Sequence, residues 1–120
     1  MITQNENPIK ESKYSINLGE GGLANISTEK LNGILKSIFV DIGEMQNLNI
    51  MVSLKDYPFV KILDASIKNS KCFYPASIET GVLGGEFEIP SRREYALNDE
   101  LNIYLEGSIN GIVNVVIRYE

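Results

Sequence analysis

The clearest strand signature in the chain is the stretch LNIMVSL, residues 48–54. Its apolar residues at even positions, from Leu48 to Leu54, alternate with Asn49, Met51 and Ser53. Successive side chains of a β-strand point to opposite faces of its sheet, so this segment has one apolar face and one more polar face. The stretch therefore predicts a strand that buries one side.

The residues that follow this stretch predict a hairpin. Lys55-Asp56-Tyr57-Pro58 has the composition of a turn, and an apolar run resumes from Phe59 to Leu63. We expect the two runs to pair.

The same period-two pattern recurs along the chain. Tyr14, Ile16 and Leu18 alternate with polar residues, and Ile34, Ile38, Val40 and Ile42 share one face of a longer segment. Shorter β-type runs lie at 66–67, 71–74, 86–89 and 95–97, separated by turn clusters at 68–70, 81–85 and 90–91. Strands at such intervals predict an all-β fold, an antiparallel β-sandwich or a jelly-roll-like barrel, formed by a single domain over residues 14–120.

Two segments depart from the strand pattern. Residues 1–13 are polar and contain Pro8, so they have little to bury and are predicted to form a flexible N-terminal arm. Ser27 or Thr28 could cap a helix that Asn32-Gly33 would end after about one turn, so the fold is predicted to contain at most one short helix.

The last twenty residues predict a second hairpin around Asn110-Gly111. A two-residue loop would place apolar residues opposite charges. A three-residue loop pairs Leu105 with Val115, Ile103 with Ile117 and Leu101 with Tyr119. Because burying each aliphatic side chain stabilises the fold by about 1.5–3 kcal/mol, the three-residue loop is the prediction.

Charge and hydropathy argue against two classes of partner. The net charge of −5 and the pI of about 4.8 repel phosphate backbones and anionic lipids, so we expect no nucleic-acid or membrane partner. Arg92-Arg93 is flanked by acidic residues and is interpreted as a local ion-pair or turn feature. No signal peptide is expected, and no stretch approaches the roughly 18 apolar residues of a transmembrane helix.

The chain lacks histidine, which removes most acid–base, nucleophilic and zinc chemistry. Cys72 is its single cysteine and is expected to be a small buried apolar residue. Asn98-Asp99-Glu100 lacks the spacing of a calcium loop, and the glycine runs at 19–22 and 81–85 lack the context of a phosphate loop. We predict no catalytic, cofactor-binding or metal-binding residues.

Tyrosines supply the remaining functional signal. An aromatic ring with a polar tip is favoured at protein interfaces and in sugar-binding grooves, and the absence of tryptophan favours protein partners over carbohydrate. The candidate contact residues are Tyr57, Tyr74, Tyr95, Tyr104 and Tyr119.

The stretches SIFVDIGEMQNLNIMVSL and FYPASIETGVLGGEFEIPSRREYALNDELNIYLEGSINGIVNVVIRYE together resemble the small β-sandwich structural proteins of tailed bacteriophages. The ending VNVVIRYE, after an Asn-Gly turn, is similar to the closing hairpin of such virion proteins. The resemblance implies a non-enzymatic capsid decoration (cement) protein that is located in the virion. It would bind the major capsid protein or other virion proteins, with a homotrimer favoured.

Three alternatives remain open. A tail or baseplate component belongs to the same class. A carbohydrate-binding or adhesion module belongs to a different one. A small enzyme would have to use the acidic residues Glu86, Glu88 or Asp99, since paired carboxylates can perform acid–base chemistry without histidine.

Overall fold

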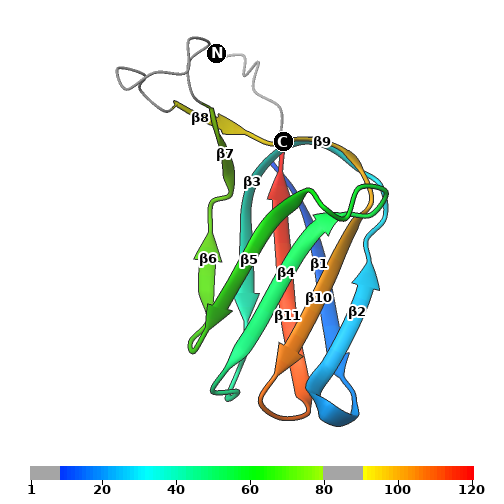
Figure 1. The fold of residues 1–120 in the computed structure, drawn as a ribbon, viewed down its shortest axis with the longest axis vertical. Helices are drawn as coiled ribbons and strands as arrows, with labels where there is room; N and C mark the ends of the chain where they lie inside the picture. The colour runs from blue at the N-terminus through cyan, green and yellow to red at the C-terminus, as the bar shows by residue number, and fades with distance from the viewer. Residues whose placement is uncertain (1–8, 80–90) are drawn as a thin grey trace, which may run out of the picture.

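The computed structural model describes residues 9–79 and 91–120. These residues form a β-sandwich of two antiparallel sheets, which confirms the predicted all-β class (Figure 1). The first sheet follows the order β1-β11-β3-β6, and β9 pairs with the first part of β3. Its strands are β1 (Lys10–Leu18), β11 (Gly111–Tyr119), β3 (Leu31–Asp41), β6 (Lys71–Phe73) and β9 (Ala96–Asp99).

The second sheet lies in front of the first in Figure 1 and follows the order β2-β10-β4-β5. Its strands are β2 (Leu23–Ser27), β10 (Leu101–Gly107), β4 (Leu48–Leu54) and β5 (Lys61–Ile67). A separate pair, β7 (Ala76–Glu79) and β8 (Ser91–Glu94), connects β6 to β9. The expected β-run at 86–89 and the glycine run at 81–85 lie outside the described residues.

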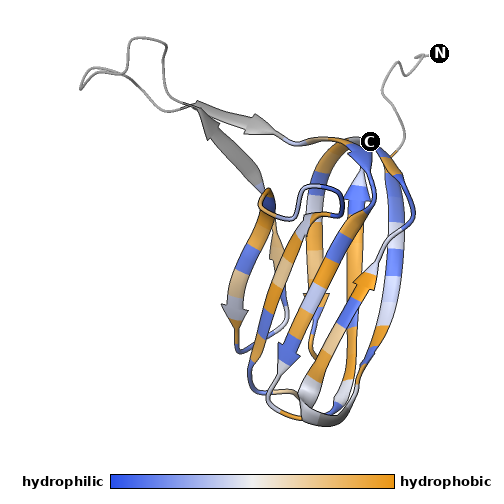
Figure 2. Cartoon of the chain, turned by 45° about the vertical axis from the view of Figure 1, so that its right-hand side comes forward, coloured by the Kyte–Doolittle hydropathy of each residue, from blue (hydrophilic) through white to orange (hydrophobic). Residues whose placement is uncertain are grey.

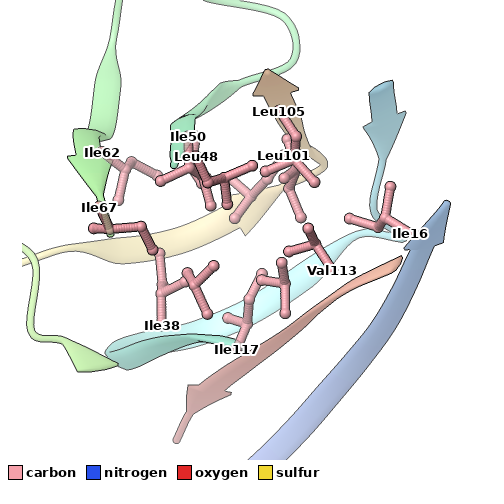
Figure 3. Packing of buried hydrophobic residues seen from close by; sticks show 14 of the residues in the cluster. Ile16, Ile38, Leu48, Ile50, Ile62, Ile67, Leu101, Leu105, Val113 and Ile117 are labelled. Atoms are coloured by element: carbon pink, nitrogen blue, oxygen red, sulfur yellow. The ribbon is translucent and has the colours of Figure 1, made fainter. Parts of the chain in front are cut away.

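Alternating side chains from the two sheets fill the space between them. Figure 2 shows apolar and polar residues alternating along the strands, and Figure 3 shows the apolar ones meeting in the interior. Leu101, Ile103 and Leu105 of β10 are fully buried, as are Val113 and Ile117 of β11. Each such side chain contributes about 1.5–3 kcal/mol through burial, so this interior is the main source of stability.

The β4–β5 hairpin confirms the clearest prediction from the sequence. Leu48 pairs with Ile67 and Ile50 with Ala65, so the two strands form the expected hairpin. The turn is longer than predicted, because β5 begins at Lys61 and Phe59 lies in the turn. The apolar face of β4 is buried as far as Val52.

The predicted C-terminal hairpin is wrong, because β10 and β11 belong to different sheets. β10 pairs with β2 and β4, whereas β11 pairs with β1 and β3. The apolar stripes of β10 and β11 face the same interior from opposite sides, which buries them as well as direct pairing would. At Gly107, where the chain leaves the second sheet, a Cβ atom would displace the ends of the Leu18 and Met45 side chains, which pack against the glycine.

The N-terminal prediction also needs correction. β1 begins at Lys10, so residues 10–13 of the expected flexible arm belong to a strand, and residues 1–8 lie outside the described part of the chain. The short helix that Ser27 or Thr28 could have capped does not form in this described segment, which agrees with the prediction of at most one short helix. Thr28 instead donates its backbone N–H to the Leu101 carbonyl at 2.8 Å and accepts the Leu101 N–H on Oγ1 at 2.9 Å, which fixes an extended connection. A single turn of 3-10 helix, η1 (Glu20–Gly22), lies within the glycine run instead.

Near the start of β3, the residues that face the core differ from those predicted. The pairing with β11 shifts by one residue around Lys36, so Leu35 and Ile38 both face the core and Ile34 is exposed. The prediction that Ile34 shares the buried face is wrong, and the alternation predicted from Ile38 onward is confirmed. Gly33 has a φ of 139° and approaches the carbonyl of Glu120, the residue after β11, so closely that a side chain would block the contact.

Candidate interaction surface

A shallow depression opens on the outer face of the first sheet. A row of paired positions crosses four strands there, because Lys13 pairs with Val116, Val116 with Phe39, and Phe39 with Cys72. A second row places Glu11 beside Arg118. The depression has a volume of about 380 Å³, and we call it the Phe39 depression after its central residue. It is lined by Glu11, Lys13, Ser37, Phe39, Cys72, Val116 and Arg118.

The floor of the Phe39 depression is apolar. Phe39 lies in the middle of the sheet and remains 38% exposed, although the residues on either side of it are fully buried. Val116 and Cys72 flank it on the neighbouring strands, and both are half-buried. An aromatic ring exposed in mid-sheet offers contact area that folding has left unused.

The rim of the depression is charged and internally paired. Arg118 donates from Nε to Oε2 of Glu11 at 2.6 Å, and Nζ of Lys13 lies 3.7 Å from Oε1 of the same carboxylate. The pairing with Glu11 holds the Arg118 guanidinium beside Phe39. Because the side chains of both cations are more than half exposed, the pairs contribute little to stability, and two cations beside one carboxylate leave the rim with a net positive charge.

Tyr74 extends the depression beyond β6. A hydrogen bond to the Cys72 sulfur raises the pKa of the Tyr74 hydroxyl, while the positive charge of Arg118 acts in the opposite direction. The Cys72 thiol is free and half-buried, so its expected burial is only partial. An aromatic ring, a thiol and a guanidinium thus lie at one end of the depression.

The turn between β4 and β5 presents a second exposed feature, which we call the aromatic loop (residues 55–60). Phe59 is 79% exposed and Tyr57 is 52% exposed, and their rings meet edge to face with centroids 6.0 Å apart. The loop is closed by a 2.8 Å hydrogen bond from the Val60 N–H to the Tyr57 carbonyl and by an ion pair of 3.2 Å between Lys55 and Glu100. Its aromatic rings therefore project from a fixed turn.

A polar cluster beside β1 links two segments of the sandwich and forms no binding site. Glu29 accepts hydrogen bonds from Ser12 Oγ at 2.8 Å and from Tyr14 Oη at 2.7 Å, and we call this group the Glu29 clasp. The hydrogen bond from Tyr14 holds the pKa of the Glu29 carboxyl below its usual range. Burial and the hydrogen bond to Glu29 raise the pKa of Tyr14 to about 12. The clasp joins β1 to the connection that follows β2.

The tyrosines chosen from the sequence do not form one site. Tyr57 and Tyr74 are exposed on different strand connections, while Tyr95, Tyr104 and Tyr119 are half-buried. Only Tyr74 adjoins the Phe39 depression. The sequence did contain a signal for Phe39, because three consecutive apolar residues, 38–40, cannot all face the core of a regular strand.

The acidic residues considered for catalysis are not brought together among the described residues. Asp99 pairs with Leu31 at the end of β9, and the neighbouring Glu100 is engaged by Lys55. Glu86 and Glu88 lie outside the described residues, as do the side chains of Arg92 and Arg93, whose backbones pair with β7. Within residues 9–79 and 91–120, no three metal-ligating side chains are grouped. The same part of the chain has no helix long and apolar enough to span a membrane.

Comparisons with protein-family models, with curated proteins and with solved structures find no match to this chain.

Proposed function

We propose that this protein is a non-enzymatic structural component of a bacteriophage virion, acting as a decoration protein on the outer surface of the head. In this proposal the major capsid protein is the partner and the decorating unit is a homotrimer. The resemblance described above suggests the kind of particle. The Phe39 depression suggests the contact surface.

The exposed Phe39 ring beside Arg118 is the observation that carries this proposal. Aromatic residues and arginine are enriched in the cores of protein–protein interfaces, and a few such residues supply most of the binding energy. Val116 and Cys72 enlarge the apolar floor around the ring. A partner side chain seated in the depression would cover this apolar floor and leave the charged rim in contact with solvent.

Co-sedimentation with capsids tests the proposal. Capsids assembled from the major capsid protein of the same genome are mixed with the purified protein and sedimented. Saturable binding at a fixed ratio is expected, and the Phe39→Ser variant should bind about 30-fold more weakly, the loss that a hot-spot residue of about 2 kcal/mol produces.

Ser66→Ala provides the matched control, because Ser66 is exposed on the outer face of the other sheet. This variant should bind like the wild type. Wild-type protein that fails to sediment with capsids would contradict the head assignment, and binding to isolated tails in the same assay would favour the tail or baseplate alternative.

A carbohydrate-binding module is the second candidate, and the aromatic loop is the observation that favours it. Exposed rings on a fixed turn can pack against sugar rings as well as against protein. A glycan array probed with wild-type protein and with Phe59→Ala tests this function. Glycan binding that is lost in the variant would support it, and absence of glycan binding would reject it.

A further inference from the structure

The edges of the two sheets differ in how they are protected. Among the described residues the edge strands are β1, β6 and β9 of the first sheet and β2 and β5 of the second. An edge strand presents unpaired N–H and C=O groups that can pair with another chain, and proteins usually block such edges with charged side chains, proline or very short strands. These edges can be compared in the same terms.

The hydrogen bonds of Thr28 show which backbone groups of β2 are open. Its N–H is bonded to the Leu101 carbonyl, so Thr28 belongs to the set of residues that point toward β10. The direction of the backbone N–H and C=O groups alternates along a strand. The backbone groups of Ile26 and Ala24 therefore also point toward β10, whereas those of Ser27 and Asn25 point to the open edge.

The inner face of β2 is also incompletely covered. Ala24 and Ile26 point toward the core but are only half-buried, and Leu23 on the outer face is exposed. At one end of the strand the Leu23 carbonyl accepts the Gly19 N–H at 3.2 Å. The open stretch therefore combines free main-chain groups with partly exposed aliphatic side chains.

The other edges carry the usual protection. On β1 the same alternation, counted from the Ile34–Glu120 pair, places Glu11 and Lys13 at open positions. On β5 the exposed Asp64 is engaged by Lys61 at 3.6 Å. β6 has only three residues and begins with a lysine, and β9 has only four residues and ends with Asp99. The five residues LANIS of β2 contain no charge and no proline.

We propose that β2 pairs antiparallel with β2 of a second copy of this chain, about a two-fold axis that passes beside Asn25. This register places Asn25 opposite Asn25 and Leu23 opposite Ser27, so it overlaps all five residues. It uses the open backbone groups of Asn25 and Ser27, and the Leu23 carbonyl, which already accepts the Gly19 N–H, has a second lone pair for the partner. Ile26 of each copy then lies opposite Ala24 of the other on the inner face. The contact joins two four-stranded sheets into one sheet of eight strands.

A second copy suits this edge because the edge is self-complementary. Two-fold pairing apposes no like charges within β2, and each partly exposed Ile26 meets a small residue across the axis. Five paired residues bury much less than the roughly 1,600 Å² of a standard interface, so the dimer dissociates on dilution. The contact leaves the Phe39 depression free, so it is independent of head binding. The homotrimer of the proposed function would then form on the head, while the free protein forms this dimer.

Sedimentation equilibrium over a range of protein concentrations tests the pairing. The wild-type mass is expected to rise from 13.4 kDa toward twice that value as concentration increases. Asn25→Pro removes the central open N–H without removing a bond to β10, and this variant should remain monomeric. Asn17→Pro is the matched control, because Asn17 occupies an open position on β1, and it should associate like the wild type.

Circular dichroism and thermal unfolding establish that each variant is folded. If Asn25→Pro is unfolded, Asn25→Lys replaces it, since a lysine at the axis places two charges together and should also abolish the dimer. A wild type that stays monomeric at every concentration would overturn the pairing. Association that is unchanged in the folded Asn25 variant, including a trimer of unchanged mass, would overturn it as well.

Discussion

The outward-facing side chains of the two sheets are arranged differently. On the second sheet the outward side chains satisfy one another: Ser66 Oγ donates to Asn49 Oδ1, and Asn49 Nδ2 donates to Glu106 Oε1 at 3.2 Å. On the first sheet an aromatic residue, Phe39, occupies a central outward position, and its polar neighbours pair around it. Both faces are compatible with the same interior, so the difference between them is the basis for proposing a partner surface on the first sheet.

The interior that supports both faces should respond most strongly to mutation. Ile103→Ala removes a fully buried side chain at the centre of β10 and leaves a cavity, so the free energy of unfolding should fall by about 2–5 kcal/mol. Urea denaturation measures this change. A loss below about 1 kcal/mol would indicate that the two sheets do not pack as described.

Two variants, one on the outer face of each sheet, test whether only the first sheet contributes to binding. Phe39→Ser and Met51→Ser each replace an outward residue of an inner strand, one on each sheet. In capsid binding by surface plasmon resonance, Phe39→Ser should weaken affinity about 30-fold or more, as expected for a hot-spot residue, and Met51→Ser should change it less than about 3-fold. Equal effects of the two changes would remove the distinction between the faces.

The Glu29 clasp should contribute less, and its contribution should depend on pH. Glu29→Gln weakens two hydrogen bonds to a carboxylate, so the free energy of unfolding at neutral pH should fall by about 1–2 kcal/mol. Because the pKa of folded Glu29 is lowered, its stabilisation is fully present above the ordinary carboxyl pKa of about 4.3 and is lost as pH falls through the folded value.

Urea denaturation of both proteins between about pH 6 and about pH 3 spans the ordinary carboxyl pKa of about 4.3 and measures this dependence. The difference between wild type and Glu29→Gln should shrink toward the acidic end. Glu106→Gln is the matched control, since Glu106 is exposed and accepts one hydrogen bond from Asn49. A difference for Glu29→Gln that is independent of pH would contradict the role of the charged carboxylate.

The polar network of the second sheet should have the smallest effect. Asn49→Ala removes both hydrogen bonds that join Ser66 and Glu106 through Asn49, but all three residues are exposed and can bond to water. The free energy of unfolding should fall by less than about 1 kcal/mol. A larger loss in thermal or urea unfolding would indicate that this face is a stabilising element and not a solvated one.

The sequence predicted which side of a strand is buried better than it predicted which strands pair. Residues 48–54 alternate without interruption and are joined to their neighbour by a turn, so both the strand and its hairpin are confirmed. β10 and β11 alternate as regularly, yet they lie in opposite sheets. Burial of an apolar stripe is equally complete beside a strand or across the sandwich, so periodicity alone cannot distinguish the two.

Local irregularities account for the other differences between prediction and structure. The shift near Lys36 moves Leu35 into the core in place of Ile34, and no periodic pattern contains that information. The Phe39 depression joins residues from β1, β3, β6 and β11, which are brought together only by the order of the strands. Of its lining residues, only Cys72 was considered from the sequence, and there as a buried residue.

The reactivity of Cys72 provides the most direct test of the assignment of the first-sheet face to partner binding. This thiol is the only one in the chain and lines the Phe39 depression, so its alkylation rate reports whether that surface is covered. The rate is measured for the free protein and for the protein bound to capsids, with Ser66→Cys in a Cys72→Ser background reporting on the opposite face. Protection of Cys72 with continued reactivity at position 66 is the predicted result, and an unchanged rate at Cys72 in the bound protein would contradict the assignment.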